Sequence, residues 1–306
     1  MIDKIYTLTR EELNELLDDL GVKRIEAHST NKFTIGFIEM LHMQFPEVLK
    51  KWQKKINMNN NFKFCGYQWE CAMEGGRIIH PDHPHVFYDD SQLWYQGITA
   101  NAMLTLKKYT EPVEVKYWDG KTYHPQYGGG LLRSIDTFGY GTFSADIQLP
   151  QGKGLFPSFW LCGEGSWPEH GEIDVMEGYT DHNCLRIFTP YFPWINPSWT
   201  TTTNVHYSED NTHKELHPRS VSVFKQPLNP SNHYIHYECK WTPDEIVIKV
   251  NGKVVRRDTK VVRQFLYGED GKKMRVIFNL LCDDPAKHEV CMDKPMLISN
   301  FKYQPL

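Results

Sequence analysis

Residues 171–178 read Gly-Glu-Ile-Asp-Val-Met-Glu-Gly, a short strand-like run that carries three carboxylates. Alternate side chains of a strand point to the same face, so Glu172 and Asp174 share a face and the residues between them point to the core. Strict alternation would turn Glu177 into that core, where a lone carboxylate is costly. A β-bulge near Val175–Met176 would shift the register by one residue and return Glu177 to the acidic face.

Three acids on one sheet face repel one another, so at least one of their pKa values is expected to be raised. A pair of carboxylates in this state suits cleavage of a glycosidic bond, because one group attacks while a protonated one donates to the leaving oxygen. Retention of configuration needs carboxyl groups roughly 5–5.5 Å apart. Same-face positions lie about 6.6 Å apart along a strand, so strand twist and the long Glu172 and Glu177 side chains must close the gap.

Outward from this run, short alternating segments separated by Gly, Pro, Asn and Asp extend to the end of the chain. Apolar and polar residues alternate strictly from Thr142 to Leu149. A second alternating run, 246–250, meets Asn251-Gly252, which is typical of a type I′ hairpin turn. This pattern predicts an all-β fold, an antiparallel sandwich, over residues 58–306.

Residues 1–57 have a different pattern and are predicted to form a small helical segment of unassigned role. Thr9 and Glu12 have the spacing of a capping box, and leucines recur at helical spacing as far as Leu20. Four asparagines within residues 57–61 then indicate a turn or linker.

Composition excludes several classes of partner. The net charge of -4 and the isoelectric point near 6.4 provide no basic field to hold nucleic acid. No apolar run reaches the roughly 18 residues of a membrane span. The seven cysteines form no C-x-x-C pair, which argues against a zinc knuckle. Met1–Gly21 is acidic and amphipathic, so no secretory signal is predicted.

Three segments together resemble glycoside hydrolase family 16, the group of laminarinases, agarases, carrageenases and lichenases. They are Tyr-Gly-Thr-Phe-Ser-Ala-Asp-Ile-Gln-Leu-Pro at 140–150, Gly-Leu-Phe-Pro-Ser-Phe-Trp-Leu at 154–161, and Trp-Pro-Glu-His-Gly-Glu-Ile-Asp-Val-Met-Glu at 167–177. The E-x-D-x-x-E spacing resembles the bulged laminarinase, agarase and carrageenase branch, whereas lichenases usually have E-x-D-x-E.

The resemblance implies a concanavalin-like β-jelly-roll of two curved antiparallel sheets with a glycan cleft on the concave face. It implies Glu172 as the nucleophile, Glu177 as the general acid/base, and Asp174 as the acid that orients and tunes them. No cofactor is required for this chemistry, and the partner is a polysaccharide. Such enzymes usually act outside the cell.

Five further positions are predicted to contact substrate. The resemblance places Trp167 as an indole that stacks on sugar near the cleavage point, and His206 and Asn279 in the cleft. Trp160 either lines the cleft or belongs to the core. Many relatives carry Arg at the position of Leu131, and Arg133 lies on the same strand face and can substitute. Asn300 stands where relatives often have an Asp that binds a structural calcium ion.

Three functions remain open at this point. The best-supported is a retaining endo-β-glycanase acting on β-1,3-glucan, because the run from Trp167 to Asp174 is laminarinase-like. An endo-hydrolase of a β-linked, sulfated galactan such as agar, porphyran or carrageenan would need cationic subsites from Arg133, Arg186 or Arg219. A non-catalytic sugar-binding module could use the same fold.

A metallohydrolase is a fourth reading, and it is rejected. His213 and His217 are four residues apart, but the Glu between them is at neither position that zinc-binding helices use.

Overall fold

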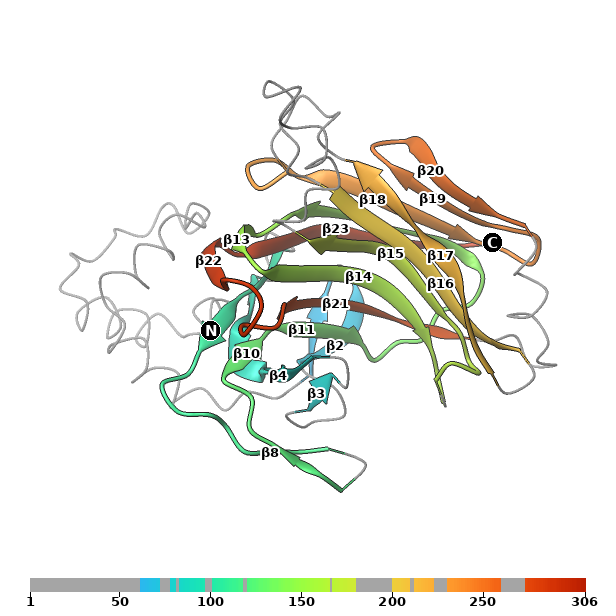
Figure 1. Ribbon diagram of the computed structural model, residues 1–306. Helices are drawn as coiled ribbons and strands as arrows, with labels where there is room; N and C mark the ends of the chain where they lie inside the picture. The colour runs from blue at the N-terminus through green and yellow to red at the C-terminus, as the bar shows by residue number, and fades with distance from the viewer. Residues whose placement is uncertain are drawn as a thin grey trace, which may run out of the picture. The chain divides into compact units, whose positions relative to one another are not determined.

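The computed structural model describes residues 61–71, 78–80, 83–96, 101–117, 120–165, 167–179, 200–209, 212–222, 230–259 and 273–306. The predicted helical segment, residues 1–57, lies outside this part of the chain. The described residues are almost entirely in strands, as the alternating pattern predicted (Figure 1). Among these residues no helix is long and apolar enough to cross a membrane.

The sheet that carries the acidic run, called the acid sheet here, has eight strands. Its order is β1-β2-β11-β21-β14-β15-β16-β17, and neighbouring strands all pair antiparallel. The bounds are β1 Asn61–Phe64, β2 Tyr67–Cys71, β11 Leu131–Ser134, β21 Met274–Cys282, β14 Leu155–Gly163, β15 Glu172–Tyr179, β16 Thr200–Glu209 and β17 Thr212–Ser222.

A second sheet, the outer sheet, has seven strands in the order β20-β19-β18-β12-β23-β6-β5. The bounds are β20 Lys253–Asp258, β19 Ile246–Val250, β18 Ile235–Trp241, β12 Gly141–Gln148, β23 Met296–Pro305, β6 Asn101–Leu104 and β5 Leu93–Gln96. β12 shows the predicted strict alternation of buried and part-exposed residues. Asn251 and Gly252 both have positive φ between β19 and β20, as a type I′ turn requires.

Aromatic side chains fill the space between these two sheets. Phe159 and Phe278 stack on neighbouring strands of the acid sheet with ring centroids 4.6 Å apart. Trp69 meets Phe301 of the outer sheet edge-on at 5.1 Å. All four side chains are buried. Since strand side chains alternate, this core fixes which residues of β14 and β21 point away from it, onto the opposite face of the acid sheet.

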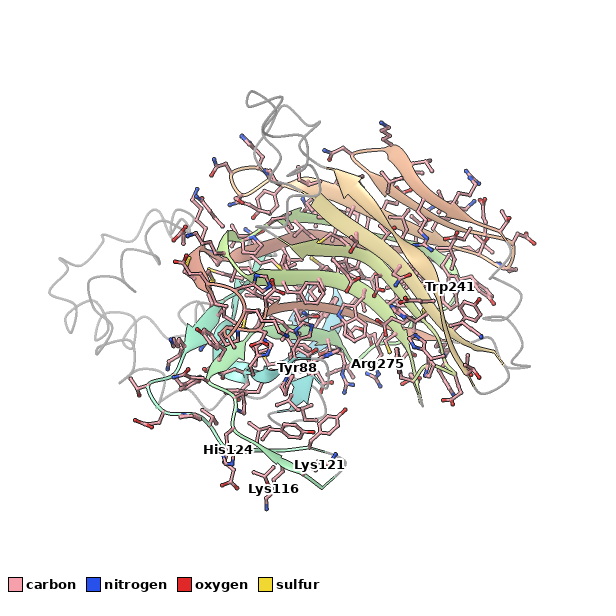
Figure 2. The ribbon with its side chains drawn as sticks, viewed as in Figure 1. Tyr88, Lys116, Lys121, His124, Trp241 and Arg275 are labelled. Atoms are coloured by element: carbon pink, nitrogen blue, oxygen red, sulfur yellow. The ribbon has the colours of Figure 1, made fainter. Side chains whose placement is uncertain are left out.

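A third sheet of four strands, the wall sheet, has the order β3-β4-β10-β7. The bounds are β3 Ile79–His80, β4 His83–Tyr88, β10 Tyr127–Gly129 and β7 Leu106–Lys108, and the 3-10 helix η1 spans Asp90–Gln92. β10 runs parallel to β4, so the prediction of antiparallel sheets holds for the two large sheets and not for this one. Two ribbons complete the fold, β13 Gln151–Lys153 with β22 Cys291–Lys294 and β8 Val115–Lys116 with β9 Thr122–Tyr123. The β8–β9 ribbon carries Lys116 and Lys121 away from the large sheets (Figure 2).

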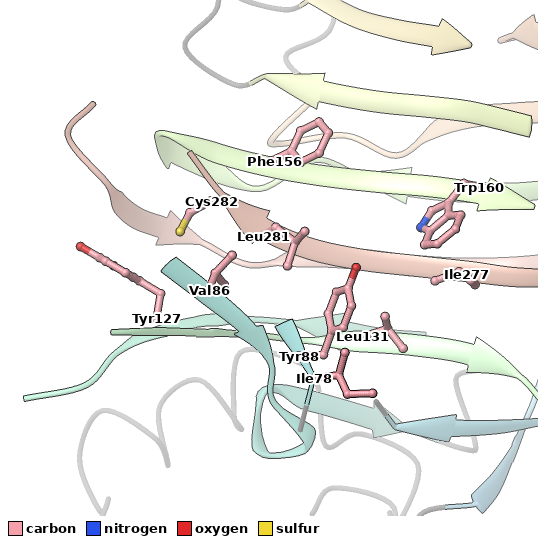
Figure 3. Close-up of a cluster of buried hydrophobic side chains, with 10 residues drawn as sticks. All are labelled: Ile78, Val86, Tyr88, Tyr127, Leu131, Phe156, Trp160, Ile277, Leu281 and Cys282. Carbon is pink, nitrogen blue, oxygen red and sulfur yellow. The ribbon is translucent and has the colours of Figure 1, made fainter. Parts of the chain in front are cut away.

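The wall sheet packs on the acid sheet through an apolar cluster on the face opposite the aromatic core (Figure 3). Its members are Ile78, Val86, Tyr88, Tyr127, Leu131, Phe156, Trp160, Ile277, Leu281 and Cys282. The two sheets approach closely at Gly129, where an added Cβ would lie 2.0 Å from the carbonyl oxygen of Leu280. Only glycine allows β10 to approach the backbone of β21 this closely.

This contact gives a stability prediction. Gly129→Ala forces β10 away from β21, and we expect the free energy of unfolding to fall by about 2–3 kcal/mol in chemical denaturation. Gly139→Ala is the matched control, because the nearest atom to an added Cβ there is the Tyr303 hydroxyl at 4.0 Å. The control should change stability by less than about 0.5 kcal/mol. Equal effects of the two substitutions would contradict the packing argument.

Candidate active site

The acidic strand β15 contains the predicted bulge. Its pairing with β14 shifts register between Phe159 and Trp160, and its pairing with β16 shifts between Asp174 and Glu177. The partners of the three acids on β16 are spaced by two residues each: His206, Asn204 and Thr202. Paired residues of neighbouring strands project on the same side, so Glu172, Asp174 and Glu177 share one face.

The residues absorbed by the bulge are Val175 and Met176, and both are fully buried. Glu177 is partly exposed, as is Glu172, whereas Asp174 between them is 2% exposed. The predicted bulge is therefore confirmed, and it keeps the third carboxylate out of the aromatic core.

The carboxyl groups of Glu172 and Asp174 lie side by side, and their side-chain contact favours the protonated form of Glu172. Oδ2 of Asp174 is buried and accepts no hydrogen bond from the residues that the structure describes. The pair therefore concentrates negative charge on a surface that is poorly solvated.

The pKa values of both outer acids are shifted upward. Burial raises the pKa of Glu172 well above its ordinary value, and the charge of Asp174 and its hydrogen bond raise it further. Burial also raises the pKa of Glu177, followed by the charges of Asp174 and Glu215. A carboxyl that keeps its proton toward neutral pH can act as a general acid.

Trp167 lies in the turn before β15, next to Glu172. Its indole Nε1 donates a hydrogen bond of 2.6 Å to Oε2 of Glu172, which lowers the pKa of that carboxyl and so opposes the other influences. The indole is 51% exposed, which is unusual for a large apolar side chain. An exposed aromatic ring beside a carboxylate is suited to stacking on a sugar.

His206 on β16 connects the acids to the edge strand. Its Nε2 lies 3.2 Å from Oδ2 of Asp174, and its Nδ1 lies 2.9 Å from Nε2 of His213 on β17. Asn204 Nδ2 lies 3.2 Å from His206 Nε2 and donates to Oε2 of Glu215, also at 3.2 Å. The structure thus places His206 beside the acids, as the resemblance implied.

Trp160 and Asn279 lie on the same side of the sheet as the acids but are engaged with each other. Trp160 Nε1 donates a hydrogen bond of 2.7 Å to Oδ1 of Asn279, and the two side chains are 9% and 2% exposed. The wall residue Tyr88 belongs to the same cluster as Trp160, and its ring rises from β4 toward β21 (Figure 3). The structure shows the hydrogen bond between Trp160 and Asn279. Direct contact of either side chain with a glycan stays a prediction.

Arg133 on β11 is separated from β15 by β21 and β14. Its Nε donates to Oε1 of Glu70 on β2 at 2.5 Å, and both side chains are largely buried. The guanidinium is thus paired with a carboxylate. Its predicted role in binding substrate stays a prediction, and its charge is already balanced.

One group of possible metal ligands lies among the described residues of the acid face. Glu172, Asp174 and His206 each offer a ligand atom, and these atoms lie within 4.8 Å of one another. His213 and His217, in contrast, lie four residues apart on strand β17, where about 3.3 Å per residue separates their Cα atoms by roughly 13 Å. A zinc site of two helical histidines is therefore wrong for this segment.

The structural calcium of the resemblance would lie near Asn300. Nδ2 of Asn300 donates to Oδ2 of Asp146 at 2.8 Å, and Oδ1 of Asp146 lies 2.7 Å from Nδ1 of His236. Calcium takes 6–8 oxygen ligands, whereas both oxygens of the one carboxylate here already face nitrogen atoms. These contacts do not fit a calcium site, and we derive no role for the ion.

Four residues around the acids were not predicted as site residues: Asn204, His213, Glu215 and Tyr88. The pairing of β15, β16 and β17 brings the first three together, and the sequence carries no local signal for it. His213 was noticed only within a spacing typical of a different site. Tyr88 comes from the wall sheet, whose position depends on long-range packing.

The chain is similar in sequence to known glycoside hydrolases. The family model described as glycosyl hydrolases family 16 matches residues 85–290. A beta-glucanase of Rhodothermus marinus is 24% identical over 131 residues, 38% of this chain and 36% of that protein. A glucan endo-1,3-beta-glucosidase of Cryptopygus antarcticus is 32% identical over 69 residues, 21% of this chain and 26% of that protein. The matched region spans only about a third or less of these curated relatives.

The fold is similar to that of a solved structure from Bacteroides ovatus, a mixed-linkage glucan enzyme in complex with a G4G4G3G product. The TM-score is 0.57 at 19% identity, and the match covers 80% of this chain and 97% of that one. At this identity the likeness establishes the jelly-roll architecture alone.

The crowded acids give a second stability prediction. The pKa of Glu172 is raised by folding, so ionising it at alkaline pH costs the folded state free energy. We expect Glu172→Gln to raise the thermal unfolding midpoint by about 2–4 °C near pH 8. The difference should shrink as the pH falls and Glu172 takes up its proton.

Glu289→Gln is the control for this measurement. Glu289 forms an exposed ion pair with Lys153 at 2.5 Å, and such pairs contribute little. A midpoint for Glu172→Gln that does not exceed those of the wild type and this control would refute the cost assigned to the acid cluster.

Proposed function

Because the chain belongs to glycoside hydrolase family 16, we propose that it is a retaining endo-β-glycanase that hydrolyses β-1,3-glucan by double displacement. The observation that carries the proposal is the bulge in β15, which brings Glu172, Asp174 and Glu177 to one face. A strand without the bulge would leave the reaction with no proton donor beside the nucleophile.

In the first displacement, a carboxylate oxygen of Glu172 attacks the anomeric carbon. Glu177 gives its proton to the glycosidic oxygen, and the bond from that oxygen to the anomeric carbon breaks. In the second displacement, Glu177 takes a proton from water, and the resulting nucleophile releases the sugar from Glu172. The raised pKa of Glu177 supports its first role, since the group must enter the reaction protonated.

Asp174 and Trp167 control the state of the nucleophile in this proposal. The charge of Asp174 beside Glu172 favours the protonated form of that carboxyl. The indole N–H of Trp167 donates to Glu172 and favours its charged form. The exposed ring of Trp167 then offers a surface for a pyranose ring beside the reacting carbon.

The choice of β-1,3-glucan rests on the glucanase relatives and on the exposed Trp167. A sulfated galactan requires cations that are available to sulfate groups. The guanidinium of Arg133 is paired with Glu70, which disfavours Arg133 as a sulfate ligand, whereas Arg186 and the side chain of Arg219 lie outside the part of the chain that the structure describes. A binding module without catalysis needs no cluster of carboxyl groups with raised pKa values, so the acids favour an enzyme.

Reducing-end release from a panel of glycans tests the substrate and the nucleophile together. We expect the wild type to act on laminarin in preference to mixed-linkage glucan, agarose, porphyran and κ-carrageenan. Glu172→Gln and Glu177→Gln should each lower kcat by about 10³-fold or more, with folding confirmed by circular dichroism. Preference for a galactan would replace the substrate assignment, and silence of the wild type on every glycan would favour the binding module.

The stereochemical outcome tests the double displacement separately. Proton NMR of laminarin during the first minutes should show the β-anomer of the new reducing ends before mutarotation. Initial appearance of the α-anomer would mean inversion, with a water molecule rather than Glu172 as the attacking group.

The raised pKa values predict a pH profile. Glu172 must be ionised, so the rate falls as the pH drops through its pKa, and Glu177 must be protonated, so the rate falls as the pH rises through its pKa. Because both values are raised, the bell-shaped profile of kcat/KM should lie above the range of ordinary glutamates, about 4.3.

Trp167→Phe extends the pH test, because it removes the N–H that lowers the pKa of Glu172. The acid limb of this variant should move to higher pH while the alkaline limb stays in place. An unmoved acid limb would show that this hydrogen bond does not tune the nucleophile.

A further inference from the structure

His213 is an exposed histidine of the edge strand β17 that the proposed chemistry does not use. It lies on the acid face, because it pairs with Ser208, two residues beyond His206 on β16. The neighbouring position on that face of β17 is Glu215, which pairs with His206. Its position on the same face as the acids therefore follows from the strand register and not from a loop.

Three rings meet at this point, and we call Trp167, His206 and His213 the ring cluster. The rings of Trp167 and His213 have centroids 4.6 Å apart, and those of His206 and His213 stack with centroids 5.2 Å apart. Trp167 and His206 are 6.0 Å apart. His213 is thus closer to Trp167 and to His206 than those two rings are to each other.

Each of its two partners acts on a different carboxyl group. Trp167 donates to Glu172, and His206 lies 3.2 Å from Asp174. The 2.9 Å contact between Nδ1 of His206 and Nε2 of His213 needs one donor and one acceptor. The tautomer of His206, and with it the group presented to Asp174, is therefore linked to the tautomer of His213.

We propose that His213 is a positioning residue. Its ring contact holds the Trp167 indole, the platform for the sugar, in place. Its hydrogen bond to His206 orients the His206 ring toward Asp174. This inference rests on the proposed function, since it assigns Trp167 to sugar binding and the acids to catalysis. The two contacts act on different steps: the ring contact supports substrate binding, and the hydrogen bond supports the chemical step.

The two contacts can be separated by substitution. His213→Phe keeps a ring against Trp167 but has no nitrogen for His206, so it should lower kcat on laminarin and leave KM near the wild-type value. His213→Gln keeps a nitrogen within reach of His206 but loses the ring, so it should raise KM and largely retain kcat. His213→Ala loses both contacts, and kcat/KM should fall by about tenfold or more.

A double-variant cycle adds a readout that a general structural role would not move. In the Trp167→Ala background, the KM effect of His213→Ala should disappear, because the platform that His213 supports is already gone. Lys214→Ala is the matched control: it changes the next residue of the same edge strand, on the opposite face, and should leave kcat and KM unchanged.

The outcomes separate the two proposals. An active wild type with unaltered kinetics in His213→Ala overturns the role of His213 alone, as do additive KM effects in the double variant. A wild type that is inactive on every glycan overturns both the proposed function and this inference.

Discussion

The structure of the site depends on one irregularity of backbone pairing, the bulge that absorbs Val175 and Met176. A strand can present its side chains to one face only at every second residue, so acids five residues apart fall on opposite faces of a regular strand. The bulge removes this conflict at the expense of unpaired backbone. It is held in place because both absorbed side chains are buried.

The bulge also brings three carboxyl groups, those of Glu172, Asp174 and Glu177, together on one patch of the sheet, where water cannot fully screen their charges. The pKa of Glu172 is raised as a result, and the indole N–H of Trp167 donates a hydrogen bond that favours the charged form of this carboxyl. Such crowding opposes folding and supports the proposed chemistry, because groups with shifted pKa values suit acid–base catalysis at a cost in stability. The aromatic core and the close contact at Gly129 provide packing that stabilises the fold against this cost.

Several features of the fold and of the site could be predicted from the sequence. The alternation in β12, the turn at Asn251-Gly252 and the bulge in β15 are local patterns, and each is confirmed. The position of Trp167 next to Glu172 also followed from a local motif. The parallel pairing of β10 with β4 did not, because no local pattern distinguishes a parallel partner from an antiparallel one.

The sequence by itself determined the all-β pattern, the alternating strands β12 and β19, the face on which each acid lies and the resemblance to the family, because side-chain alternation and short motifs are properties of neighbouring residues. Only the tertiary structure decided that Trp160 and Asn279 bond to each other, that Arg133 is paired with Glu70, and that His213 reaches His206. Each of these contacts joins different strands. Its existence depends on strand order and register, which are set by packing of the whole sandwich rather than by any one segment.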